Sequence, residues 1–413
     1  MERQETWAGV KHRQHDNRPG SLNPHIRCQF RLMNKPALRS PSQDGFSLVE
    51  LMVAVLLGTI LSAGVVSVYL ASEKDYGLNN ALSEVQKSGR SALSLLEPRI
   101  RMAGFLGCRD DVQPQSILKT DLTTYSLNAP AQGYEYVGTG MGATYAMGTD
   151  PPNAAAWSPS LPPDIRQAIG TDSTAAGAAV AGSDILLLHE AVPSGVTLAN
   201  PSTDDPDGVF VETGQGTRLS IGELAIVSDC AHTNLFQITD VAENYQGGPR
   251  DRIAHSPDAN LDPGNAVPGR FINDGHSADA QLLLYQIHLF YIGLRRDRNT
   301  ALYEVSLQND GTLGKPMELV SGVESMQLLY GVDTDDDGIP NRFLTADEIA
   351  DWKQVVNVRI ALLTRGGQNS ADAGGTSSYK LLDQSRGVTL AVPADGRIRR
   401  VFEETISIRN RLP

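Results

Sequence analysis

The sequence predicts an α+β fold in which one long N-terminal helix is followed by an antiparallel β-rich globular domain, and the first half of the helix is membrane-spanning. Residues 46–71 are all apolar or small except Glu50, and about 20 apolar residues are enough to cross a bilayer as a helix. Strand-like segments gather in the second half of the chain. A helix followed by a run of strands is typical of this fold class.

The segment before the apolar run is basic. Residues 1–45 contain eight Lys or Arg and four acidic residues, and such a positive excess keeps this side of a membrane span in the cytoplasm. An ordinary secretory signal is cut after its apolar region, whereas here the small residue Gly45 stands directly before the run. Inside a membrane a carboxylate is costly unless it meets a partner, so a functional role is the default hypothesis for Glu50.

The block Gly45-Phe46-Ser47-Leu48-Val49-Glu50 resembles the cleavage and methylation site of type IV prepilins and of type II secretion pseudopilins. The resemblance implies cleavage after Gly45, N-methylation of Phe46, and pairing of Glu50 with the methylated amine of a neighbouring subunit during filament assembly. The alternative for Glu50 is a tolerated acid that reaches the membrane interface. Met33 offers an internal start with a 13-residue leader, so we expect residues 1–32 of the 1–45 leader to be an over-extended start.

After the span the pattern becomes amphipathic. Apolar or small residues recur at spacings of three and four, which marks one face of a helix. They are Leu78, Leu82, Val85, Gly89, Leu93, Leu96, Ile100 and Ala103. We therefore expect a transmembrane or filament-core helix over residues 46–72, an amphipathic helix over 73–103 and a β-rich pilin domain over 104–413. One helix through both segments would be about 87 Å long, and Pro98 should kink its last turns.

Within the β domain, residues 110–219 are rich in Gly, Ala, Pro, Ser and Thr, which predicts a loop-rich insert punctuated by turns. Its one clear strand is 184–189. Alternating or β-branched runs predict the remaining strands. They are 223–228, 234–239, 281–292, 301–307, 318–330, 355–363 and 401–408.

Three further stretches narrow the resemblance. Residues 100–108, 319–333 and 399–412 resemble PilW-type minor pilins, although that family usually lacks a proline where Pro98 stands. The resemblance implies a low-abundance, non-catalytic pilin that joins other minor pilins in a tip complex and primes polymerisation of the major pilin. Twitching motility, adhesion and DNA uptake would follow.

The implied partners also include prepilin peptidase and the inner-membrane assembly platform. The implied location is the inner membrane, crossed once with the domain in the periplasm, and then the pilus at the cell surface. One alternative is a GspJ-like pseudopilin of a type II secretion system, which has a similar strand at 319–333. The stretch between Cys108 and Cys230 is long for a pseudopilin. A second alternative is a calcium-dependent, membrane-anchored adhesin.

Cleavage would leave 368 residues with 27 basic and 44 acidic side chains, a net charge of −17. This charge argues against direct nucleic-acid binding, which expects a basic face. Two cysteines remain, Cys108 and Cys230. An even pair in an exported domain suggests one disulfide, and two unpaired thiols are the alternative.

The stretch 333–341 has the D-x-D-x-D-G pattern that opens a calcium loop, with Asp333, Asp335 and Asp337 as the candidate ligands. Leu344 stands where an EF-hand would carry its bidentate acid, although acids of the next turn could substitute. The alternative is an ordinary acidic turn between strands. No other cofactor is expected.

The sequence does not predict an enzyme. The glycines of residues 138–143 superficially resemble a phosphate-binding loop, but no βαβ unit surrounds them, so a flexible loop is the better interpretation. The histidines are scattered without metal-site spacing, and no nucleophile motif is present.

Overall fold

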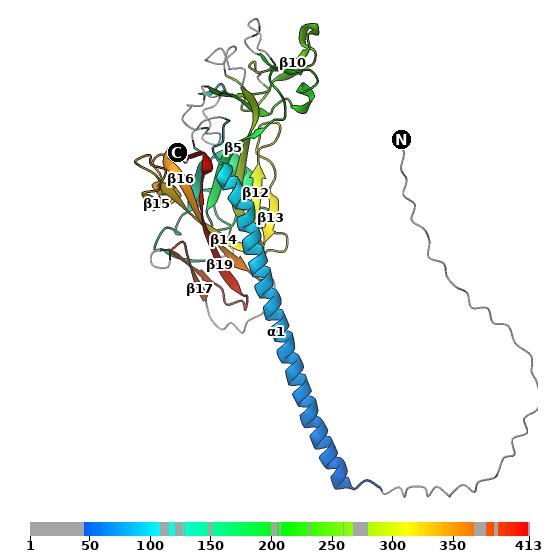
Figure 1. Cartoon of the computed structure of the whole chain (residues 1–413). Coiled ribbons are helices and arrows are strands. Elements are labelled where there is room, and N and C mark those ends of the chain that lie inside the picture. The colour runs from blue at the N-terminus through cyan, green and yellow to red at the C-terminus, as the bar shows by residue number, and fades with distance from the viewer. Residues whose placement is uncertain are drawn as a thin grey trace, which may run out of the picture. The chain divides into compact units, whose positions relative to one another are not determined.

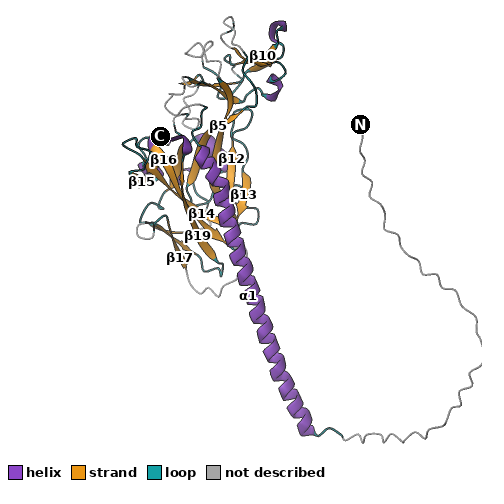
Figure 2. Ribbon diagram, viewed as in Figure 1, coloured by secondary structure: helices purple, strands orange, loops and turns teal. Residues whose placement is uncertain are grey.

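The computed structural model describes residues 45–107, 115–119, 127, 129–147, 151–199, 205, 208–229, 232–258, 260–266, 280–366, 377–383 and 387–411. The chain divides into two compact units, residues 1–65 and residues 66–413. The described α-helices are α1 (Leu48–Met102) and α2 (Pro163–Ile169). Figure 1 colours the chain by residue number, and Figure 2 separates helix from strand.

The described strands are β1 (Gln115–Ser116), β2 (Ala131–Tyr136), β3 (Thr144–Ala146), β4 (Trp157–Ser158), β5 (Ile185–Pro193), β6 (Gly208–Glu212), β7 (Leu224–Ser228), β8 (Thr233–Gln237), β9 (Asp240–Ala242), β10 (Arg250–Ala254), β11 (Gln281–Leu294), β12 (Thr300–Ser306), β13 (Met317–Ser321), β14 (Val323–Val332), β15 (Arg342–Leu344), β16 (Val355–Arg365), β17 (Ser377–Leu381), β18 (Val388–Val392) and β19 (Arg399–Ser407). One long helix followed by these strands confirms the predicted α+β class.

In the first unit, the described residues are the opening turns of α1. Every described side chain from Gly45 to Val65 is exposed. α1 is long and apolar enough to cross a membrane, since an 18-residue window has a mean hydropathy of 2.4 and none of that window is buried. A continuous apolar surface of this kind needs lipid or protein around it.

The second unit is built from four sheets. The largest has nine strands in the order β1-β8-β7-β11-β5-β2-β4, and β12 and β13 extend it from β11. A four-stranded sheet has the order β15-β14-β16-β19, and two three-stranded sheets have the orders β6-β10-β9 and β17-β18-β3. The pairs are antiparallel except β1 with β8 and β18 with β3. The predicted antiparallel β domain is therefore confirmed.

Alternation along the strands gives the large sheet two apolar faces. Leu188 of β5 and Phe290 of β11 pack in one cluster with Leu96 of α1 and with Leu328 of β14. Their sequence neighbours belong to a second cluster, on the other face, which also holds residues of α2. The second half of α1 therefore lies between the large sheet and the β14 sheet, as the cyan part of the helix in Figure 1 shows.

Small residues let α1 approach the strands closely. The buried helix positions are Ala81, Val85, Ser88, Gly89, Ala92, Leu96 and Ile100. The helix continues through Pro98 to Met102, and Gly104 follows at a φ of +75°. Its N–H donates to the carbonyl of His189 in β5 at 2.7 Å. The helix end is thus joined directly to the large sheet.

Three details differ from the sequence predictions. Leu78 and Leu82 remain exposed, because the buried face at this level is formed by Ala81 and Val85. The predicted strand 318–330 is two strands, β13 and β14, separated by Gly322 at a φ of +79°. The stretch 110–219 contributes β2, β6 and α2 to the core as well as β5. The sequence does not predict these further elements, because glycines and acidic residues interrupt the apolar pattern of the strands.

Candidate functional site

The predicted processing site lies at the start of α1. Gly45 to Ser47 precede the helix, and Glu50 is in its first turn. The Glu50 N–H donates to Ser47 Oγ at 3.3 Å, so the serine caps the helix. A Cβ built on Gly45 meets nothing within 4 Å. The described fold therefore sets no limit on the size of residue 45, and any requirement for a small residue there must come from outside the chain.

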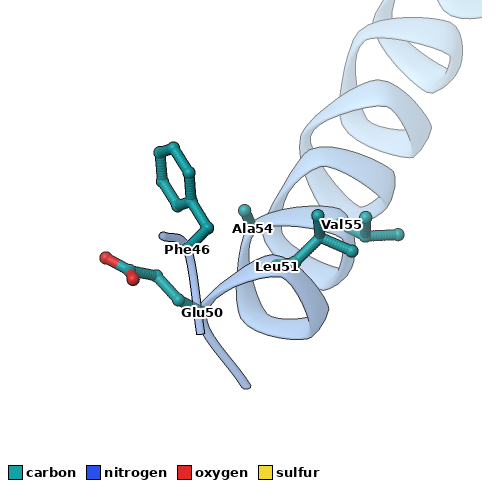
Figure 3. Close-up of a pocket in the computed structure, with 5 residues that line it drawn as sticks. All are labelled: Phe46, Glu50, Leu51, Ala54 and Val55. Atoms are coloured by element: carbon teal, nitrogen blue, oxygen red, sulfur yellow. The ribbon is translucent and has the colours of Figure 1, made fainter. Parts of the chain in front are cut away.

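Figure 3 shows Phe46 and Glu50 together with Leu51, Ala54 and Val55, which line one shallow hollow. The Phe46 side chain is 83 % exposed. The Glu50 carboxylate has no hydrogen bond or ion pair with another described residue, and the side chains around it are apolar. An unpaired carboxylate in an apolar setting favours a cationic partner. The arrangement can therefore receive a positive group supplied by another molecule.

The acidic loop joins β14 to β15. Carboxylate oxygens of Asp333, Asp335 and Asp337 lie within 4.8 Å of one another, close enough to hold one cation. Asp333 is buried and its carboxylate accepts from the backbone N–H groups of Asp335 at 3.1 Å, Asp336 at 2.8 Å and Gly338 at 2.7 Å. Burial works to raise the pKa of Asp333, but these N–H groups outweigh it and lower the pKa below its ordinary value.

The fold thus brings together the three predicted ligands, while Asp333 also closes the turn through its own hydrogen bonds. Both interpretations of the loop, calcium site and acidic turn, agree with this geometry. Calcium binding stays a prediction.

Two other predictions fall on residues outside those described. The leader with Met33 is one, and the cysteine pair Cys108 and Cys230 is the other. The described chain beside each cysteine is nevertheless informative. A Cβ built on Gly107 would lie 2.7 Å from Ser228 Oγ, so the stretch that ends before Cys108 contacts the strand that ends before Cys230. The disulfide stays a prediction, and this contact is consistent with it.

A buried polar network at the end of α1 is not among the sites that the sequence predicts. It joins Arg99 of α1 to Glu190 of β5, His288 of β11 and Glu304 of β12. The available signal was a charged residue on the apolar face of each strand, since Glu190 alternates with Leu188 and His288 with Phe290. Alternation alone could not show that these groups meet, because they come from four separate segments.

Comparison with known families gives two matches. The family described as type IV pilus-assembly protein W (PilW) matches residues 289–410, which run from within β11 to just beyond β19 and include the β14 sheet. The prokaryotic N-terminal methylation motif matches residues 40–66, which include Gly45, Phe46 and Glu50. No curated protein and no solved structure matches the chain.

Proposed function

The chain is a PilW-like type IV pilin, and from this premise we propose that it is a minor pilin that joins a priming complex at the pilus tip and initiates assembly of the major pilin. The observation that carries the proposal is the unpaired Glu50 carboxylate in the apolar first turns of α1, within the methylation motif. A subunit with this feature is incomplete without a cationic neighbour.

Cleavage by prepilin peptidase after Gly45 would supply that cation. It would create an amine on Phe46 of each subunit, and methylation leaves the amine positive. In an apolar environment, burying either charge alone costs more free energy than burying the two charges as a pair. Pairing of one subunit's amine with Glu50 of the next therefore selects a single register between neighbouring helices and rejects others.

The basic leader and the apolar helix support an inner-membrane origin. Positive residues favour the cytoplasmic side, so the β domain would enter the periplasm. From there the inner-membrane assembly platform would move the subunit into the pilus. In this role the β domain contacts other minor pilins and the major pilin and performs no chemistry. Twitching motility, adhesion and DNA uptake would depend on it through the pilus.

Deletion of the gene with complementation tests the proposal. We expect deletion to reduce surface pili, the wild-type gene to restore them, and Glu50→Ala to be processed and inserted but not to restore them. Glu73→Ala is the matched control, because it removes an exposed acid from the same helix outside the apolar run and should restore pili fully.

Secreted enzymes and surface attachment are scored in the same strains. Normal pili with a loss of enzyme secretion would overturn the proposal and assign a pseudopilin role. Normal pili with a loss of calcium-dependent attachment would assign an adhesin instead.

A further inference from the structure

The polar network at the end of α1 is almost closed to solvent. The exposed fraction of the side chain is 6 % for His288, 7 % for Glu190 and 10 % for Glu304, whereas Arg99 reaches it from α1 with 42 % exposed. Three of the four groups are thus buried between the helix and the large sheet. Such groups destabilise a fold unless their charges and hydrogen bonds are satisfied.

Both nitrogens of the His288 ring face carboxylate oxygens. Nδ1 lies 2.6 Å from Glu304 Oε1, and Nε2 lies 3.0 Å from Glu190 Oε1. An ionised carboxylate only accepts hydrogen bonds, and a neutral imidazole can donate only one. Both bonds can therefore form only when the ring carries two protons, as an imidazolium.

Arg99 completes the arrangement. Its Nη1 lies 2.7 Å from Glu190 Oε1 and 3.2 Å from His288 Nε2, so two donors converge on one carboxylate oxygen. With His288 protonated, two positive and two negative groups balance. With His288 neutral and its proton on Nδ1, Glu190 keeps only the Arg99 donor, and the two carboxylates outnumber the one remaining positive group.

We propose that protonated His288 holds the last turns of α1 on the large sheet through the carboxylate network. Loss of its proton in mildly alkaline conditions then weakens the contact between the helix end and the sheet. The proposal concerns the second unit itself and does not depend on the pilus function.

The charged and titratable groups that face the ring come from three elements. They are Arg99 from α1, Glu190 from β5 and Glu304 from β12. His189 of β5 lies on the opposite face of the sheet, where its ring stacks on Tyr285. Burial works to lower the pKa of His288, but its hydrogen bonds with Glu190 and Glu304 outweigh burial and raise the pKa above its ordinary value. Burial lowers the pKa of His189 to about 3, so that ring stays neutral and does not titrate in the same range.

The direction of the pH effect follows from linkage. A histidine whose pKa is raised on folding stabilises the fold fully below its unfolded pKa, and this contribution disappears as the pH rises through the folded pKa. Between the two pKa values, one extra bound proton changes the folding equilibrium up to about tenfold per pH unit. The window therefore opens near the ordinary histidine pKa of about 6.5 and extends upward.

The test uses the full chain in detergent micelles, with hydrogen exchange and thermal melting followed from pH 6 to pH 9. In the wild type we expect exchange in residues 96–102 to rise about tenfold per pH unit beyond the intrinsic chemical rate across the window. In His288→Gln this excess should vanish, because the amide does not titrate. The half-exposed His232 provides the control, since His232→Gln should keep the wild-type profile.

A second variant keeps the test decisive if His288→Gln does not fold. Glu304→Gln replaces a negative acceptor with an uncharged amide that can hydrogen-bond to a neutral imidazole. It should therefore lower the pKa of His288 and shift the pH range of the excess exchange to lower pH. The protonation state itself is read from ¹⁵N shifts of labelled histidine. A neutral His288 at pH 6, or identical pH profiles in wild type and His288→Gln, would overturn the proposal.

Discussion

The ring of Phe402 in β19 lies against the backbone of Gly89 in α1. A Cβ built on Gly89 would lie 2.3 Å from Phe402 Cδ2 and Cε2 and 2.6 Å from Cγ. Atoms never approach so closely, so the glycine is what permits this contact. It places the edge strand of the β14 sheet directly on the helix.

A methyl group at Gly89 should therefore weaken the fold. We expect Gly89→Ala to lower the free energy of unfolding by about 1–3 kcal/mol, as overpacking does, and to lower the melting temperature of the full chain in detergent. Gly77→Ala is the matched control, because a Cβ there meets nothing within 4 Å. It should raise stability by up to about 1 kcal/mol through helix propensity. Equal gains from the two changes would show that the Phe402 ring moves aside without cost.

Gly45→Val should leave the precursor uncut. The described structure has room for the larger side chain, so the variant should fold and insert normally, and its failure would lie in recognition by the peptidase. Mass spectrometry of the purified protein should give a mature N-terminus of methylated Phe46 in the wild type and full-length precursor in the variant. An unmethylated N-terminus after cleavage near Ala71 would contradict this prediction.

Cys108 and Cys230 should form a disulfide across a separation of 122 residues. Closing a loop of this length lowers the entropy of the unfolded chain and so stabilises the fold by about 4–5 kcal/mol, a contribution that strain in the native state reduces. Processed protein from the periplasm should have no free thiol after denaturation, and Cys108→Ser and Cys230→Ser should each lower its melting temperature by a similar amount. Two titratable thiols in the denatured, processed wild type would rule the bridge out.

Asp333→Ala should destabilise the loop between β14 and β15, because three backbone N–H groups lose their acceptor. We expect a lower melting temperature in calcium and in chelator alike. Asp335→Ala with Asp337→Ala separates the two interpretations of the loop. A calcium site requires a melting temperature several degrees higher in calcium than in chelator, with no effect of magnesium, and loss of that difference in the double variant. An acidic turn requires no difference at all.

Glu135→Gln should stabilise the protein above neutral pH. Glu135 of β2 is buried beside Asp184, whose carboxylate accepts from the N–H groups of Tyr136 at 2.9 Å and Leu328 at 2.8 Å. Burial, and then the charge of Asp184, raise the pKa of Glu135 to about 10. A carboxyl with a raised pKa stabilises the fold below its unfolded pKa, and its contribution falls as the pH rises.

Glutamine imitates the protonated acid at every pH, so the variant should gain a few degrees of melting temperature at pH 8 and little at pH 5. The exposed Glu243 offers a control, since Glu243→Gln should show no such pH dependence. A uniform loss of stability in Glu135→Gln at both pH values would mean that the acid is ionised in the fold.

Local patterns predict much of this fold because they report on one element at a time. The apolar run and the three–four spacing predict α1, the short apolar run 185–188 predicts β5, and alternating or β-branched runs predict β11 and β16. They fail where a neighbour decides the outcome. Ala81 is buried and Leu82 is exposed because of where the strands lie. Strand β2 is not recognisable from its sequence, because it contains Gly133 and Glu135, which are buried only through their contacts with Tyr330 and Asp184.

The candidate sites follow the same rule. Gly45, Phe46 and Glu50, like the three aspartates of the acidic loop, lie close in sequence, so a motif reveals them. The polar network at the end of α1 is different, because the topology brings its four residues together from separate elements. Their spacing along the chain does not predict it.

The exposed apolar surface at the start of α1 also limits how the subunit can travel. Moving a fully covered Leu, Val or Ile side chain into water costs about 1.5–3 kcal/mol, and α1 displays a continuous series of such residues from Leu48 to Leu70. Passage from one apolar surrounding to another avoids nearly all of this cost, whereas release into water incurs it for every side chain at once. The apolar surface of the helix therefore opposes its release into water. Any transfer of the helix is favourable only if a new apolar environment contacts it before the previous one is lost.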